Sequence, residues 1–357
     1  MSIVYFGVLI SVAALGYLAE NNPKCRIKKN GRIIIGPDTG AAILLTIILI
    51  LVSGLRYRVG TDYFSYYNRR VPEWEDVLHS ILHFKEGGFS LLVKLSRIIY
   101  DHGQTLIFIS AAITIGLSCW TIFQYHTIFL FSIMIYVLAG GWQEGFNGIR
   151  QCMAAAIIFA GHRLILEKKI WQYCVVLLVA STIHATSVVM IIPVLLFNRK
   201  ADLKQIAFLT IAAVIARFSY RIIFSLIESY KEKALNTTSG YLANTVNIFR
   251  ILVNFIPVIV YIVFCRKDNH TKEQTFYINV LFFNAFSMLA GMGSAYFGRI
   301  GIYTGAAVTI GYGHLLQLIE EERTRRAIAF FVLGMYLFFW IYSLDDIRNY
   351  RWIFNQS

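Results

Sequence analysis

Two arginines, one carboxylate and four tyrosines lie between Leu55 and Tyr67, close enough along the chain to form one binding site. Arginine binds phosphate oxygens through a planar fork of donors, and tyrosine can stack on sugars or hydrogen-bond to them. The turn Gly60-Thr61-Asp62 could bring its carboxylate towards the arginines. The segment therefore favours a site for a sugar that carries phosphate. The alternative is an interfacial anchor, because Tyr and Arg also favour headgroup depth in membranes.

A second candidate anion site runs from Glu144 to Gln151, directly before a stretch rich in alanine. If this stretch is a helix, its first turn offers unpaired backbone amides and the positive end of the helix dipole. Arg150 beside that turn would complete an anion site, and small residues further along would let a neighbouring helix pack closely. The alternative is an arginine that extends from the edge of a membrane span to the interface.

The chain offers few candidates for a general base beside these cations. His184 lies at the tip of an expected helical hairpin, and a histidine imidazole changes charge in the pH range where a base is useful. A lone histidine is often structural. The other candidates on the same side are Asp62 and Glu144, so we name His184 as the first candidate base and Asp62 as the second.

Two further segments carry cations at the ends of the last expected membrane spans. One is Arg299–Tyr303, and the other is Asp345–Trp352, which contains two arginines. Taken singly, each is typical of interfacial anchoring. Together with Arg56, Arg58 and Arg150, they would place cations from distant parts of the chain on one side of a membrane.

The elements that must position these segments are membrane helices. The 357 residues are 57% hydrophobic and only 15% charged, with a mean hydropathy of +0.60, and one soluble core could not bury that much apolar surface. The apolar residues come in blocks long enough to span the hydrocarbon layer as helices, which satisfy their own backbone groups. The sequence predicts an all-α, polytopic transmembrane bundle, a single membrane domain over residues 1–357.

About 10–12 spans are expected. They lie near residues 3–19, 41–55, 104–123, 127–140, 150–166, 170–183, 185–197, 206–227, 248–265, 275–291, 300–319 and 327–343. Residues 72–100 are too short on either side of Gly87-Gly88 to cross, and their one-sided apolar pattern predicts amphipathic helices at the interface. This assignment puts both termini on the outer side.

With this orientation the inward connectors hold 16 basic residues and the outward segments 13, which is a weak positive-inside bias. The formal net charge is +13, and cytoplasmic loops of a membrane protein account for a basic balance without nucleic acid. With the assignment above, nine of 16 cations in the inward connectors are lysine, but only four of 13 in the outward segments are. Lysine suffices for topology, whereas the outward excess of arginine points to an anionic ligand.

Missing motifs narrow the chemistry further. The sequence contains no P-loop, HExxH, DxD, nucleophile elbow or CxxC pair, and its five cysteines are scattered. ATP-driven work, zinc chemistry and transfer from nucleotide sugars are therefore disfavoured. We expect no metal and no cofactor.

Three of these segments, in this order, resemble the EpsG family, which is grouped with the Wzy-type polymerases of exopolysaccharides and O-antigens. They are Arg58-Val59-Gly60-Thr61-Asp62-Tyr63, Ile149-Arg150-Gln151 before an Ala-rich helix, and His184-Ala185-Thr186-Ser187. The similarity runs from about residue 41 to the C-terminus, as motif order and hydropathy. The resemblance implies a bacterial inner-membrane protein that joins undecaprenyl-diphosphate-linked oligosaccharide repeat units at the periplasmic face. It also implies a flippase and a chain-length regulator as partners.

For such a polymerase we expect an inverting transfer in which undecaprenyl diphosphate leaves the growing chain. The expected roles are diphosphate binding by Arg56, Arg58, Arg150 and Arg299, base catalysis by His184 or Asp62, and sugar contacts by Tyr63, Tyr66 and Trp142. A flippase for the same lipid is one alternative, although the chain lacks the two related halves typical of such transporters. A membrane O-acyltransferase is the other, and it would leave the arginines without a task.

Overall fold

The computed structural model of the chain describes residues 3–22, 25–29, 32–83, 85–230, 246–265, 270–343 and 349–354. These residues form two compact units. Unit 1 comprises residues 1–191 and 336–357, and unit 2 comprises residues 192–335. The expected organisation as one membrane domain over residues 1–357 stays a prediction.

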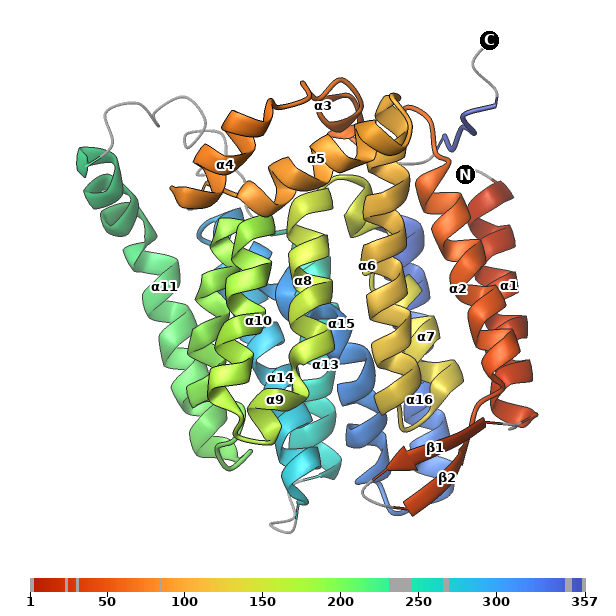
Figure 1. Cartoon of the computed structure of the whole chain (residues 1–357). Coiled ribbons are helices and arrows are strands. Elements are labelled where there is room, and N and C mark those ends of the chain that lie inside the picture. The colour runs from red at the N-terminus through yellow and green to blue at the C-terminus, as the bar shows by residue number, and fades with distance from the viewer. Residues whose placement is uncertain are drawn as a thin grey trace. The chain divides into compact units, whose positions relative to one another are not determined.

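Unit 1 is built mainly from upright helices joined in an up-and-down order (Figure 1). They are α1 (Ile3–Asn21), α2 (Thr39–Gly54), α6 (Gly103–Tyr125), α7 (Phe129–Leu138), α8 (Ile149–Gly161), α9 (Arg163–Leu166) and α10 (Ile170–Ile183). Polar side chains fix where some of them begin. Asp38 caps α2 by accepting hydrogen bonds from the amides of Gly40 and Ala41. Glu20 accepts a 2.7 Å bond from the amide of Leu130 in the first turn of α7.

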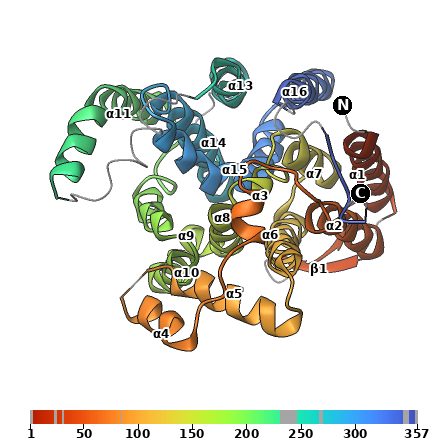
Figure 2. The same ribbon diagram turned by 90° about the horizontal axis from the view of Figure 1, so that it is seen from above.

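Three shorter helices lie across one end of these upright helices, which we call the crossing end (Figures 1 and 2). They are α3 (Tyr63–Tyr67), α4 (Trp74–Leu82) and α5 (Gly87–Ile99). Helix α5 packs on α6 and α10, whereas α4 packs mainly on α5. The outer face of α4 is apolar and exposed at Trp74, Leu78 and Leu82. The predicted amphipathic helices near residues 72–100 are confirmed as α4 and α5.

The same end receives several segments that the sequence analysis expected on one side. The end of α2, the starts of α6 and α8, and the end of α10 all lie there (Figure 1). A two-stranded hairpin, β1 (Cys25–Lys29) with β2 (Arg32–Gly36), lies at the opposite end. This hairpin was not predicted, because the connector between the first two spans was expected only to carry basic residues.

The chain turns back after α10, as predicted. His184 has an extended backbone that ends α10, and a 3-10 helix, η2 (Ala185–Leu195), follows. The hydroxyl of Tyr173, near the start of α10, donates a 3.1 Å bond to the carbonyl of Met190. One continuous helix would hold two residues that are 17 positions apart about 25 Å from each other, so this contact confirms the hairpin.

Unit 2 contains α11 (Leu203–Tyr230), α13 (Ile248–Phe264), α14 (Lys272–Ala290), α15 (Ala295–Gln317) and most of α16 (Glu322–Ser343). Helices α14 and α15 pair closely, and α13 packs on α14. Asn284 on α14 joins them, since it donates to Asn254 on α13 at 2.6 Å and accepts from Thr304 on α15 at 2.9 Å. Such polar bonds link helices where lipid offers no hydrophobic driving force.

Length and composition agree with a membrane protein. Within the part of the chain that the structure describes, four helices are long and apolar enough to cross a membrane. They are Ile3–Asn21, Gly103–Tyr125, Ile149–Leu166 and Glu322–Ser343, and shorter apolar helices accompany them. The predicted fold class, an all-α bundle of membrane helices, is confirmed.

Candidate functional site

The first two candidate segments meet at the crossing end. The amide of Thr61 donates a 2.8 Å hydrogen bond to the side-chain oxygen of Asn147. Gly60 makes this approach possible, because it has φ +97° and a Cβ there would lie 2.5 Å from the carbonyl oxygen of Phe146. The Gly60-Thr61-Asp62 turn is therefore docked on the loop that leads into α8 and Arg150.

Arg56 holds this junction together from inside. Its side chain is 1% exposed, and its guanidinium donates to main-chain carbonyls of Ser53, Val59 and Phe146 and, more weakly, of Gly145. Burial lowers the pKa of Arg56 to about 10, so the group keeps its charge at neutral pH. With its donors used by the protein, Arg56 has a structural role in place of the expected diphosphate contact.

The centre of the candidate site is a carboxylate that the sequence analysis missed. One oxygen of Glu86 forms an ion pair with Arg150. The other accepts hydrogen bonds from Nδ1 of His184 at 2.9 Å and from the amide of Ala185 at 3.0 Å. Glu86 thus joins the expected cation and the first candidate base in one group, the Glu86 triad, made of Glu86, Arg150 and His184.

Glu86 reaches this position because it forms the elbow between α4 and α5. Its backbone is left-handed, with φ +54°, a conformation that non-glycine residues adopt at some energetic cost. The two glycines that follow allow close contacts. A Cβ on Gly87 would meet the backbone of Ile81 at 2.5 Å, and one on Gly88 would meet the side chain of Thr182 at 2.2 Å. Gly87 therefore lets α5 pack closely against α4, and Gly88 lets the elbow rest on the end of α10, beside His184.

The charge state of Glu86 fixes the tautomer of His184. Burial opposes ionisation of Glu86, but hydrogen bonds from His184 and Ala185 and the charge of Arg150 outweigh it, so the pKa of Glu86 falls to about 2. An ionised carboxylate only accepts hydrogen bonds, so Nδ1 of His184 carries a proton. In the neutral imidazole, Nε2 is then the basic nitrogen. The side chains of His184 and Glu86 are each 20% exposed, which leaves the pair accessible.

Tyr66 and Phe89 form the floor under Arg150. Tyr66 is buried and its hydroxyl takes a hydrogen bond from Arg150. Burial raises the pKa of Tyr66, which this bond only partly offsets. The guanidinium of Arg150 lies 5.8 Å from the ring centre of Phe89, and that of the exposed Arg69 lies 5.7 Å from the same ring. Arg69 is a second cation near the triad that the sequence analysis did not single out.

Arg58 and Asp62 are exposed beside the docked turn. Arg58 has a left-handed backbone, with φ +56°, and its guanidinium lies over the rings of Tyr57 and Phe64 at 5.0 and 5.6 Å. No acidic side chain among the described residues pairs with it. Asp62 accepts a 3.4 Å bond from the hydroxyl of Thr61. Arg58 is therefore an aromatic-supported cation that is available to a ligand.

All three expected sugar contacts are buried: Tyr66 lies under Arg150 as described above, and the other two are core residues. Tyr63 is 0% exposed and donates a 2.8 Å bond to Gln104. Trp142 is 1% exposed and donates a 3.2 Å bond to the carbonyl of Leu49. The polar atoms of Tyr63 and Trp142 are hydrogen-bonded inside unit 1, so neither ring offers a face to a sugar. The sequence could not separate these roles, because a buried aromatic and a sugar platform have the same residue type.

The remaining expected cations lie elsewhere. Arg299 is exposed in the first turns of α15, in unit 2, so its convergence with Arg58 and Arg150 stays a prediction. Of the C-terminal segment Asp345–Trp352, residues 345–348 lie outside the described part of the chain. The rest pairs with the segment around Arg56, where Arg56 and Trp352 form an isolated antiparallel bridge.

Comparison with known protein families decides the relationship. Residues 41–354 match the model of the EpsG family. The chain belongs to the EpsG family. The match runs from α2 to the C-terminal segment and so includes every residue of the Glu86 triad. The EpsG family is linked to exopolysaccharide biosynthesis. No curated protein and no solved structure matches the chain.

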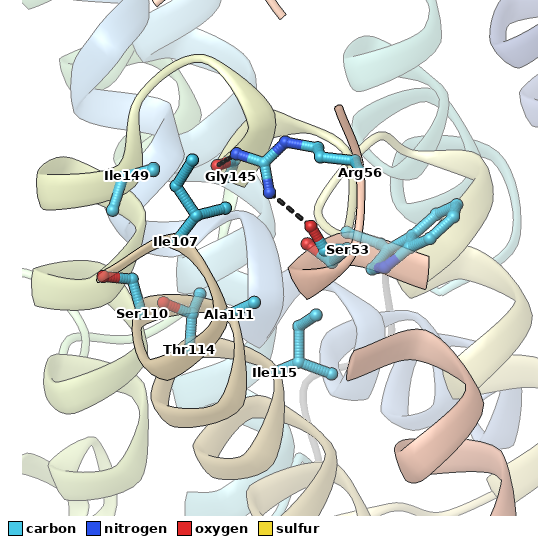
Figure 3. Close-up of a pocket in the computed structure, with 10 residues that line it drawn as sticks. Ser53, Arg56, Ile107, Ser110, Ala111, Thr114, Ile115, Gly145 and Ile149 are labelled. Carbon is cyan, nitrogen blue, oxygen red and sulfur yellow. Dashed lines mark hydrogen bonds between the residues drawn. The ribbon is translucent and has the colours of Figure 1, made fainter. Parts of the chain in front are cut away.

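One small cavity can be described in the interior of unit 1 of this EpsG-family protein. A cavity of about 10 Å³ lies between α2, α6 and the start of α8, and Arg56 forms part of its wall (Figure 3). Ser110 and Thr114 are among the residues that line it (Figure 3). Such a volume holds about one water molecule, whereas ligand pockets usually measure about 300–1,000 Å³. This cavity is therefore too small for a ligand larger than water.

Glu86 should give this EpsG-family protein a distinct pH dependence of stability. Because its pKa falls from the ordinary 4.5 to about 2 on folding, ionised Glu86 stabilises the fold fully above pH 4.5, and this contribution is lost as the pH falls towards 2. The shift corresponds to roughly 3 kcal/mol at neutral pH. We expect Glu86→Gln to lower the Tm at pH 7 much more than at pH 3, measured by scanning fluorimetry in lipid nanodiscs. An equal Tm difference at both pH values would contradict this electrostatic role.

Proposed function

We propose that this EpsG-family protein is a polysaccharide polymerase. It joins undecaprenyl-diphosphate-linked oligosaccharide repeat units at the periplasmic face of the bacterial inner membrane, beside a flippase and a chain-length regulator. The observation that carries the proposal is the Glu86 triad, which links a base and a cation through one carboxylate. A glycosyl transfer with a diphosphate leaving group needs both of these groups in one site.

In the proposed reaction, the acceptor is a hydroxyl group on the sugar at the non-reducing end of the incoming lipid-linked unit. Nε2 of His184 removes its proton while the hydroxyl oxygen attacks the anomeric carbon of the growing chain. The bond from that carbon to the diphosphate breaks, and undecaprenyl diphosphate leaves with the bonding electrons. The direct displacement inverts the anomeric configuration. Glu86 holds the imidazole in place and stabilises the imidazolium that forms.

Arg150 is the proposed ligand of the departing diphosphate. One of its nitrogens pairs with Glu86, and the guanidinium also donates to Tyr66, which leaves further N–H donors for phosphate. Its side chain is 32% exposed. Arg58 and Arg69 are exposed cations of unit 1 that could bind the same anion. Preorganised donors of this kind stabilise charge that develops in the transition state.

Two other activities would use parts of this site. A flippase for lipid-linked oligosaccharide would need the cations but not a base oriented by a carboxylate. A membrane O-acyltransferase would use His184 but would leave Arg150 and Arg58 without a substrate group. The joining of His184 to Arg150 through Glu86 therefore favours glycosyl transfer from a diphosphate.

A reconstitution experiment tests the proposal. Purified full-length protein in nanodiscs is incubated with an undecaprenyl-diphosphate-linked repeat unit, without nucleotide or added metal, and the products are separated by length. We expect a ladder of products that each differ by one repeat unit, and no ladder with Arg150→Ala. A wild-type protein that yields only single units would contradict the polymerase. Movement of a fluorescent lipid-linked unit across vesicle membranes without a ladder would identify a flippase.

A further inference from the structure

The turn after Arg58 is docked on the loop before α8, and the segment before Arg58 is held by residues 349–354, which we call the C-terminal strap. The amide of Tyr57 donates a 2.8 Å bond to the carbonyl of Arg351, and the amide of Ile353 donates a 2.9 Å bond to the carbonyl of Leu55. These two bonds form a short antiparallel ladder. They join positions that are almost 300 residues apart in the sequence.

Tyr350 anchors the strap in unit 1. Its hydroxyl donates a 2.6 Å bond to the carbonyl of Val52 near the end of α2. Its ring lies edge-on to Tyr5 on α1, with 5.7 Å between the ring centres, and to Trp352 within the strap, at 4.9 Å. These contacts fix the strap to the ends of α1 and α2, immediately beside the ladder.

Arg58 lies between two fixed points. On one side, Tyr57 is bound to the strap, and on the other, Gly60 and Thr61 are docked on the loop before α8. A left-handed backbone at an arginine persists only where the surroundings over-determine it. The strap and the loop together supply that constraint, and the resulting turn presents the Arg58 guanidinium on Tyr57 and Phe64, exposed to solvent.

We infer that the C-terminal strap is a positioning device for Arg58, with Tyr350 as its positioning residue. The expected effect of the strap on activity rests on the proposed function. Its effect on the conformation of the chain around Arg58 does not. Without the strap, Tyr57 loses its hydrogen-bond partner, the left-handed turn relaxes, and Arg58 no longer meets the phosphate groups of the lipid-linked substrate in a fixed orientation. Arg351 is itself exposed, so the strap also adds a guanidinium group next to this turn.

Hydrogen exchange followed by mass spectrometry tests whether the strap fixes the backbone around Arg58, and this test does not depend on whether the protein polymerises sugars. The variants are Tyr350→Ala, which keeps Arg351, and Tyr350→Phe, which loses only the hydroxyl. A matched control ends the chain after Phe354 and so keeps the whole strap. We expect exchange in a peptide over residues 55–62 to be about tenfold faster in Tyr350→Ala and unchanged in the control, with Tyr350→Phe in between. Unchanged exchange in Tyr350→Ala would overturn the inference.

A double-mutant cycle tests the link to Arg58. With polymer formation as readout, Tyr350→Ala and Arg58→Ala should each raise KM for the lipid-linked unit about tenfold with little change in kcat, and the double variant should resemble either single one. Additive effects on KM would overturn the role in positioning Arg58. If wild-type protein forms no polymer while hydrogen exchange near Tyr57 still depends on Tyr350, the proposed function is wrong, but the structural role of the strap is supported.

Discussion

Replacing Arg150 with alanine is expected to abolish polymer while the protein stays in the membrane at the wild-type level. The variant loses the cation proposed to bind the diphosphate, and it leaves the partly buried carboxylate of Glu86 without its ion pair. Loss of one preorganised donor to a transition-state charge typically costs about 10²–10³-fold in kcat. Because Glu86 also orients His184, we expect the loss for Arg150→Ala to reach at least that size. The products are compared by length on gels, and protein is quantified in membranes.

Two matched variants sharpen this test. Arg150→Lys keeps the charge but loses the planar fork, so it should retain a small part of the activity. Arg163→Ala removes another arginine of unit 1, which lies on α9 and pairs with Glu167, and it should leave the ladder of polymer products unchanged. Long polymer at the wild-type level in Arg150→Ala would contradict a role in diphosphate binding.

His184→Ala is expected to lower kcat by about 10²–10⁴-fold, the usual contribution of a positioned general base. Glu86→Gln keeps the size of the side chain but removes its charge, and because an amide can either accept from Nδ1 or donate to it, the tautomer of His184 is no longer fixed. It should also cause a large loss. Because the two side chains work as one unit, the double variant should be little worse than His184→Ala alone. The measurement is the initial rate of ladder formation at saturating lipid-linked substrate.

The α4 histidines provide the control. His79 and His83 are exposed and stack on each other with 4.0 Å between ring centres, and the described ion pairs of Glu86 are with Arg150 and His184. His79→Ala should therefore keep the wild-type kcat. A His184→Ala variant with normal kcat would exclude His184 as the base and return attention to Asp62.

Hydropathy was enough to predict the fold class and much of the helical layout. A membrane helix must be apolar over its whole length, so its sequence signal is local and strong. The amphipathic pair α4 and α5 was predictable for the same reason, since its pattern repeats within each helix. The β1–β2 hairpin was missed although Asn30-Gly31 lies between its strands, a dipeptide typical of two-residue hairpin turns.

The site was only partly predictable, because its contacts join distant positions. Glu86 lies 64 residues from Arg150 and 98 from His184, and nothing in its neighbourhood except Gly87-Gly88 sets it apart from other surface acids. Arg56 and Arg58 are two residues apart and looked equivalent. After the end of α2, the side chain of Arg56 turns into the protein and that of Arg58 turns towards solvent. Arg56 reaches the carbonyl of Phe146 only because the chain packs against the loop before α8.

The exposed apolar side of α4 has a practical meaning for anyone who extracts this protein. Trp74, Leu78 and Leu82 are each more than half exposed in the described structure, so we expect bilayer lipid to complete the packing of that helix. The helix ends next to the elbow that carries Glu86. Detergent micelles, which replace a flat interface with a curved one, will loosen α4 first and with it the alignment of Glu86 on His184. Preparations in native-like lipid should therefore be the starting point for enzymology.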